Sequence, residues 1–154
     1  QSKIPTHMNN LYLLNPADVL AQWPIIKPHI DSALAHSVGE MNTFQLFKKT
    51  MSGEVHVWVY LDENTQITAV LSTRFLQYEN RKSLQIMTCG GAVEDWDIWL
   101  DHNYVFENFC KNNGCSSIQI WGRKGWGRKL AKVTSQTGKS YKPLYYVYDM
   151  EIDK

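Results

Sequence analysis

Residues 83–121 read SLQIMTCGGAVEDWDIWLDHNYVFENFCKNNGCSSIQIW, and this stretch decides the fold. It begins with one compact apolar run, Ser83–Thr88, and ends with another, Ser116–Trp121. Between the two runs the apolar residues return at helical spacing, and Asn113-Gly114 supplies a helix stop. Two strands joined through a helix of this length are parallel neighbours with a right-handed crossover. We therefore expect a strand–helix–strand unit within an α/β (α+β) domain.

The predicted helix of this unit, Asp95–Asn113, has a single stripe that faces the core. The stripe consists of residues three or four positions apart: Trp96, Trp99, Asn103, Phe106 and Cys110. Asp95 and Asp97 fall in the first turn, where carboxylates interact favourably with the helix dipole.

The sequence before this unit alternates with period two, which is typical of strands. The strand-like runs cover 55–61, 66–79 and 83–88, and short polar turns separate them. Turns this short permit only antiparallel pairing. We expect a three-stranded antiparallel meander that leads into the long helix.

Helical patterns precede the meander and cover 17–23, 25–36 and 42–51. Asn15 is placed to cap the first of them ahead of Pro16, and Pro24 and Pro28 are expected to interrupt the helical region.

The chain beyond residue 121 predicts a short basic helix or turn over Gly125–Lys132 and a last strand over Pro143–Ile152. Tyr146 and Tyr148 alternate along that strand, while Tyr145 lies on its other side. We expect one face of this strand in the core and the other at an interface or at the wall of a site.

Composition restricts the class of protein. The 154 residues are 44% apolar and 20% charged with a net charge of +1, so a packed core is expected and no global nucleic-acid signature is present. Three cysteines without a CxxC pair and five scattered histidines predict neither a disulfide framework nor a metal site. No signal peptide or long apolar stretch is seen, so we expect a cytoplasmic protein. Residues 1–7 resemble the remnant of a purification tag, and 8–154 are expected to form one domain.

This order of elements resembles the core of the GNAT (Gcn5-related N-acetyltransferase) superfamily. The resemblance implies a mixed, mostly antiparallel central sheet with flanking helices and a splayed parallel strand pair. The segment from Asn113-Gly114-Cys115 to Gly122-Arg123-Lys124-Gly125-Trp126 also resembles a "GR-x-GW" element of small phage-encoded GNAT-like proteins.

The resemblance implies acetyl-CoA or another acyl-CoA as co-substrate, held where the third meander strand meets the long helix. Those positions are Thr88, Cys89, Gly90, Gly91, Ala92 and Val93. Two glycines allow a phosphate to approach the backbone, although they also suit a simple strand-to-helix bend. The basic residue that acetyl-CoA users carry in this loop is missing, and acidic Glu94 and Asp95 stand there instead.

Catalysis would require a base that takes a proton from the acceptor amine, and Glu79 and Glu94 are the candidates. Both also suit an ordinary place, in a turn or at a helix start. Cys89 could serve as a nucleophile, but a lone cysteine at a strand end is commonly a small buried apolar residue.

A basic and aromatic cluster follows the second strand of the parallel pair. Trp121, Arg123, Trp126 and Arg128 are candidate contacts to a substrate or partner, and nucleic acid is one such partner. A solvated charged face is the alternative.

The resemblance therefore implies an acyl-CoA-dependent N-acyltransferase that acts on a small-molecule or protein amine. Two alternatives remain. One is an inactive phage structural or accessory protein that uses the fold to bind protein or nucleic acid. The other is an enzyme that modifies nucleobases or nucleic acid.

Overall fold

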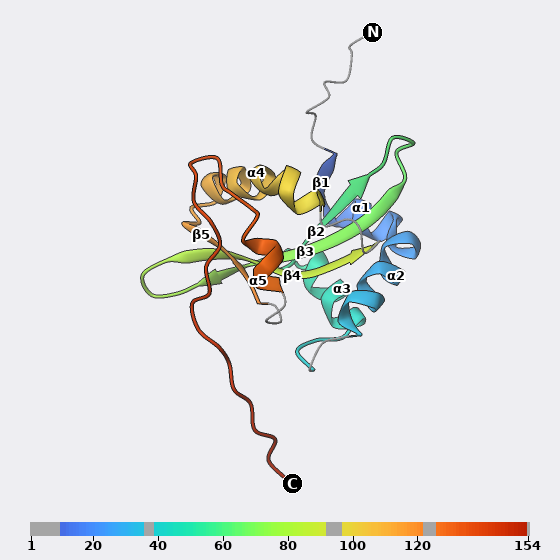
Figure 1. Ribbon diagram of the computed structural model, residues 1–154. Helices are drawn as coiled ribbons and strands as arrows, with labels where there is room; N and C mark the ends of the chain where they lie inside the picture. The colour runs from blue at the N-terminus through green and yellow to red at the C-terminus, as the bar shows by residue number, and fades with distance from the viewer. Residues whose placement is uncertain (1–9, 36–38, 92–96, 122–125, 154) are drawn as a thin grey trace.

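The computed structural model describes residues 10–35, 39–91, 97–121 and 126–153 (Figure 1). Its strands are β1 (Leu11–Leu14), β2 (His56–Leu61), β3 (Ile67–Gln77), β4 (Lys82–Gly91) and β5 (Ser117–Ile120). Its helices are α1 (Pro16–Ala21), α2 (Trp23–Leu34), α3 (Thr43–Met51), α4 (Asp97–Asn112) and α5 (Trp126–Leu130). Within these ranges no helix combines the length and the apolar character needed to cross a membrane.

The strands form one sheet in the order β1-β2-β3-β4-β5. Neighbouring strands from β1 to β4 are antiparallel, and β4 and β5 are parallel. At the β2–β3 turn one carboxylate oxygen of Asp62 accepts hydrogen bonds from the backbone N–H groups of Asn64, at 2.8 Å, and Gln66, at 2.9 Å. The predicted meander, the parallel crossover through α4 and the mostly antiparallel α/β class are confirmed.

Helices cover both faces of the sheet (Figure 1). Successive residues of β2 point to opposite faces, so Val57 and Val59 pack with the α1–α3 helices while Trp58 packs toward α4. The α4-side core consists of Leu11, Trp58, Leu71, Leu84, Ile86, Phe106, Cys110 and Val133. The α1–α3-side core consists of Val19, Ile26, Ile30, Leu46, Val55, Val57, Val59 and Val70.

The first helix begins as its sequence predicts. Asn15 accepts a hydrogen bond from the Asp18 backbone N–H at 2.8 Å, and Pro16 occupies the first turn. The helical region is interrupted near Pro24, as predicted: α1 ends at Ala21, and α2 begins at Trp23 with Pro24 in its first turn, where the missing N–H has no intrahelical acceptor. The predicted interruption at Pro28 is wrong, because α2 continues through this residue.

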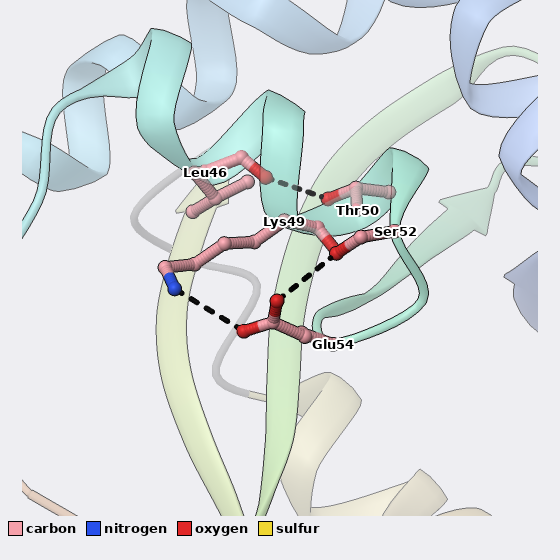
Figure 2. Close-up of polar contacts among 5 residues, drawn as sticks. All are labelled: Leu46, Lys49, Thr50, Ser52 and Glu54. Atoms are coloured by element: carbon pink, nitrogen blue, oxygen red, sulfur yellow. Dashed lines mark hydrogen bonds and ion pairs between the residues drawn. The ribbon is translucent and has the colours of Figure 1, made fainter.

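The end of α3 is joined to β2 by a tight polar turn (Figure 2). The hydroxyl of Ser52 donates to the carbonyl oxygen of Lys49 at 2.9 Å and lies 3.3 Å from a carboxylate oxygen of Glu54. The Lys49 ammonium lies 3.2 Å from the other oxygen of Glu54. The buried Thr50 hydroxyl, in the last turn of α3, donates to the carbonyl oxygen of Leu46, one turn earlier, at 2.9 Å. These contacts direct the chain straight into β2.

The predicted stripe of α4 is confirmed for Asn103, Phe106 and Cys110, which are buried. Trp96 and the side chain of Trp99 lie outside the described part of the chain. A short loop after α5 returns to this helix, because the Gln136 N–H donates to a carboxylate oxygen of Glu107 at 2.9 Å.

The predicted last strand is wrong. Residues 141–153 belong to no strand or helix, and Tyr145, Tyr146 and Tyr148 are 63%, 63% and 90% exposed. Neither face of Pro143–Ile152 therefore lies in the core. Alternation gives a segment the propensity for a strand, but the ladder requires a neighbour, and no described strand lies beside this one.

Candidate functional site

The two parallel strands separate halfway along β4. β5 pairs with β4 from Ser83↔Ser117 to Ile86↔Ile120, and β5 ends there. β4 continues to Gly91 and stays paired with β3 through Ala69↔Gly91. Over Met87–Gly91 the β5-side edge of β4 therefore has no strand partner among the described residues, and we call this stretch of unpaired strand edge the gap.

A β-bulge marks the start of this gap. Ser72 pairs with Thr88 and Thr73 with Ile86, so Met87 is an extra residue on β4. A bulge increases the local twist and re-aims the backbone. β4 therefore stops pairing with β5 at the same place where the bulge distorts β4.

Thr88, a predicted cofactor-binding residue, lies at this bulge. It is 8% exposed, and its hydroxyl oxygen lies 2.5 Å from that of the fully buried Ser72 on β3. Two buried hydroxyls that bond one another avoid the cost of unsatisfied polar groups. The side chain of Thr88 therefore holds β4 to β3 and leaves the backbone to line the gap.

A polar row crosses the sheet before the bulge, on the face opposite the α4-side core. It consists of the Cα partners Arg74, Gln85 and Gln119. The Arg74 Nε–H donates to the Gln85 side-chain oxygen at 2.6 Å. Gln119 accepts hydrogen bonds from the Tyr78 hydroxyl at 3.0 Å and from the Trp121 indole N–H at 3.1 Å. The sequence reasoning missed this row, because only the strand register aligns its members.

A second polar group that the sequence reasoning missed lies on the α4 side. Thr73 Oγ1 accepts a hydrogen bond from the Trp58 indole N–H at 2.9 Å and lies 2.9 Å from His56 Nδ1. The rings of Phe75 and Phe109 pack on the imidazole at 4.7 and 5.2 Å between centroids. Burial, together with the nearby Lys82 ammonium, lowers the pKa of His56. This histidine is therefore a neutral structural group at pH 7.

The structure changes the setting of the predicted phosphate loop. Gly90 and Gly91 belong to β4 and pair with Val70 and Ala69, so the expected bend at these glycines is a strand. Cys89 also lies on β4, opposite Leu71. The remaining predicted residues of this loop, Ala92, Val93 and Glu94, lie outside the described residues, as does Asp95.

The structure does not bring Glu79 to the gap. Glu79 is exposed in the turn between β3 and β4. Thr88 lies six positions along β4 from Lys82 at the end of this turn, which is roughly 20 Å of extended chain. Its assignment as a base stays a prediction that no described contact supports.

The predicted basic and aromatic cluster is placed in part. Trp121 follows β5 directly and is 57% exposed. Trp126 begins α5, and Arg128 is exposed on the same helix. Arg123 lies outside the described residues. The described members of the cluster therefore follow the end of β5, where its pairing with β4 stops.

The cysteines away from the gap are poor nucleophiles. Burial raises the pKa of the Cys110 thiol to about 12, and burial also raises the pKa of Cys115. Because the thiolate is the reactive form, the raised pKa disfavours reaction of either thiol at neutral pH.

Solved structures share this arrangement of strands and helices. A probable acetyltransferase superposes with a TM-score of 0.67 at 9% identity, over 96% of this chain and 99% of that one. The chain has the GNAT fold. An aminoglycoside acetyltransferase from an uncultured soil metagenomic sample, in complex with sisomicin, gives 0.64 at 15% identity, over 92% and 95%. The ribosomal-protein-alanine N-acetyltransferase from Brucella melitensis biovar Abortus 2308 gives 0.60 at 11%, over 92% and 100%.

The sequence itself adds no further relative. No protein-family model matches the chain, and no curated protein matches it significantly. At 9–15% identity the structural likeness establishes the GNAT fold alone.

Proposed function

We propose that the protein is an acyl-CoA-dependent N-acyltransferase that moves an acetyl or similar acyl group to an amine. One observation carries the proposal: β4 and β5 separate after Ile86↔Ile120, at the bulge formed by Met87. Within the part of the chain that the structure describes, this separation leaves the β5-side edge of Met87–Gly91 without a strand partner.

An acyl-CoA fits such an edge chemically. Its extended arm carries amide groups, and the β5-side backbone of Met87–Gly91 can exchange hydrogen bonds with amides as a neighbouring strand would. The co-substrate supplies an acyl group activated as a thioester. Ala92 and Val93 precede α4, and we propose that they hold the pyrophosphate near its N-terminal end.

The residues of the chain would then act on the reacting atoms. Backbone N–H groups at the gap would hydrogen-bond the acyl carbonyl oxygen, where negative charge develops as the amine attacks. A carboxylate acting through water would take the ammonium proton, and Glu79 and Glu94 stay the predicted candidates for this base. The acyl group moves to nitrogen, and the thiol leaves with a proton.

The acceptor would bind from the side of the polar row. A solved acetyltransferase of this fold is in complex with the aminoglycoside sisomicin. We propose a small amine that carries hydroxyl or carboxylate groups beside the reacting nitrogen, since Arg74 and Gln119 offer N–H donors to such groups. Trp121 and Arg128 follow β5 and would contact the same ligand from the other wall.

The resemblance of the segment around Gly114 to phage-encoded proteins supports a phage origin as part of this proposal. The thiols of Cys110 and Cys115 are free, which suits the cytoplasm of a bacterial host.

Calorimetry with acetyl-CoA tests the proposal. The parent chain should bind, and Gly91→Val should weaken binding by about tenfold or more, equivalent to ~1.4 kcal/mol, because a branched side chain would crowd the strand edge. Ala21→Val is the control, since it adds the same side chain at an exposed position of α1. An absence of acetyl-CoA binding by the parent chain at large excess would refute the proposal. Unchanged affinity in Gly91→Val would refute this placement of the site.

The alternative is a GNAT-fold protein that binds another macromolecule without acyl transfer. The exposed apolar residues of the C-terminal segment and the exposed Arg128 and Lys132 favour it. Thermal unfolding separates the two: acetyl-CoA raises the midpoint of an enzyme of this type and leaves that of a binding protein unchanged.

A further inference from the structure

The C-terminal segment leaves the folded body at a definite anchor. The Tyr141 hydroxyl donates to the side-chain oxygen of the buried Asn103 at 2.8 Å, and its ring packs on the α4-side core. Ser140 just before it bridges to Thr134. Every described residue after Tyr141 is exposed, and the segment runs away from the sheet (Figure 1).

This segment, Leu144–Ile152, has the pattern of a two-faced strand. One face carries Leu144, Tyr146, Tyr148, Met150 and Ile152, which are 56–90% exposed. The opposite face of its second half carries Asp149 and Glu151. A continuous row of large apolar side chains in water marks an interaction surface. We call Leu144–Ile152 the tail strand.

β5 offers the edge that such a strand needs. It pairs with β4 on one side, and no strand pairs with its other side among the described residues. Ile118 and Ile120 of β5 are half-buried against the α4-side core. A strand added here would extend that core with its own apolar face.

The charges of the two segments are complementary. The acidic face of the tail strand carries Asp149 and Glu151, and the exposed Arg128 and Lys132 lie in and just after α5, the helix that follows β5. In its own chain the tail strand makes no described backbone hydrogen bond with β5, although it starts only three residues after the Tyr141 anchor. A chain with both a free strand and a free edge can satisfy both by exchange with an identical chain.

We propose that two copies of this chain exchange their tail strands, each adding Leu144–Ile152 to the β5 edge of the other. The exchange is symmetric, since each copy gives one strand and receives one. The tail strand has nine residues against four in β5, and where it runs past Ile120 the partner copy would form the outer wall of the candidate site.

Light scattering after size exclusion tests the exchange, and it does not depend on any acyl transfer. The full chain should show twice the chain mass of 17.9 kDa. Only alternate N–H groups of an added strand face its neighbour, so one of two consecutive prolines must remove a ladder bond. The double variant Tyr146→Pro/Val147→Pro should therefore fall to the mass of one chain. Its matched control, Tyr146→Phe/Val147→Thr, keeps both N–H groups and the β propensity, and it should remain a dimer.

A chain that ends at Lys142 should also show the mass of one chain, and its thermal transition reports that the body still folds. Hydrogen exchange should show protected amides in 144–152 in the parent dimer and unprotected amides in the proline variant. A parent that is monomeric at all concentrations, whether its tail amides are protected by its own sheet or not, would overturn the proposal. So would a dimer that survives both the prolines and the deletion.

Discussion

Strand β2 and the tail strand share an alternating sequence pattern, but β2 is largely buried and the tail strand is exposed. β2 reads HVWVYL and the tail strand LYYVYDMEI, and both alternate β-branched or aromatic residues. β2 lies between β1 and β3, and Val57, Trp58 and Val59 are at most 3% exposed. The tail strand has no described neighbour, and Tyr148 is 90% exposed. The pattern marks a segment that can be a strand, whereas a paired edge decides whether it is buried.

The largest expected effect is a difference in the free energy of unfolding between a variant in the packed region and a variant in the tail strand. Phe106 is 1% exposed, and its ring lies 5.0 Å from that of Trp58. Phe106→Ala should lower the free energy of unfolding by about 3–5 kcal/mol, since it removes a large buried side chain and leaves a cavity. Tyr148→Ala should change it by less than about 0.5 kcal/mol in a dilute, monomeric sample.

Urea unfolding of both variants measures this difference, with light scattering to establish the monomer. If Tyr148→Ala lost about as much free energy of unfolding as Phe106→Ala, the tail strand would have to pack on its own body. That result would contradict the difference between the two regions.

An intermediate effect is expected at Tyr141, where the packed region ends and the tail begins. Tyr141→Phe keeps the ring but leaves the buried side-chain oxygen of Asn103 without this donor. The free energy of unfolding should fall by about 1–2 kcal/mol. Burial raises the pKa of the Tyr141 hydroxyl, so it remains a donor at neutral pH.

Chemical denaturation checks this loss, and Tyr145→Phe is the matched control. Tyr145 is 63% exposed and has no described side-chain hydrogen bond, so its hydroxyl should contribute little. Equal losses in the two variants would remove Tyr141 as the anchor.

The smallest expected effect is a pH dependence that arises at His56 on β2. Burial lowers the pKa of this imidazole, so the unfolded chain binds a proton more readily than the folded chain. The contribution of His56 to stability is therefore complete above about pH 6.5, the ordinary pKa of histidine. It is lost progressively as the pH falls from there to the pKa in the folded state.

Urea titrations of the parent and of His56→Phe from neutral to mildly acidic pH measure this contribution. The parent should lose stability more steeply on acidification than the variant. Parallel curves would contradict this prediction. They would mean that protonation of His56 costs the folded protein no stability, despite the nearby Lys82 and aromatic rings.

The candidate site was predictable only in outline. The strand–helix–strand pattern of residues 83–121 predicted a parallel pair, and Thr88 does lie where that pair diverges. The bulge at Met87 carries no sequence signal of its own, because it depends on how β4 is matched to β3. The row of Arg74, Gln85 and Gln119 was equally invisible, since three separate strands align it.

The sequence by itself determined the local elements: the Asn15 cap, the turn at Asp62, the meander and the stripe of α4. Each depends on residues close together in the chain, whose hydrogen bonds or periodicity are local. Only the tertiary structure decided the strand register, the point where β5 leaves β4 and the exposure of the tail strand. These depend on which edges meet across long sequence separations, and an edge remains open or closed according to its neighbour rather than its own residues.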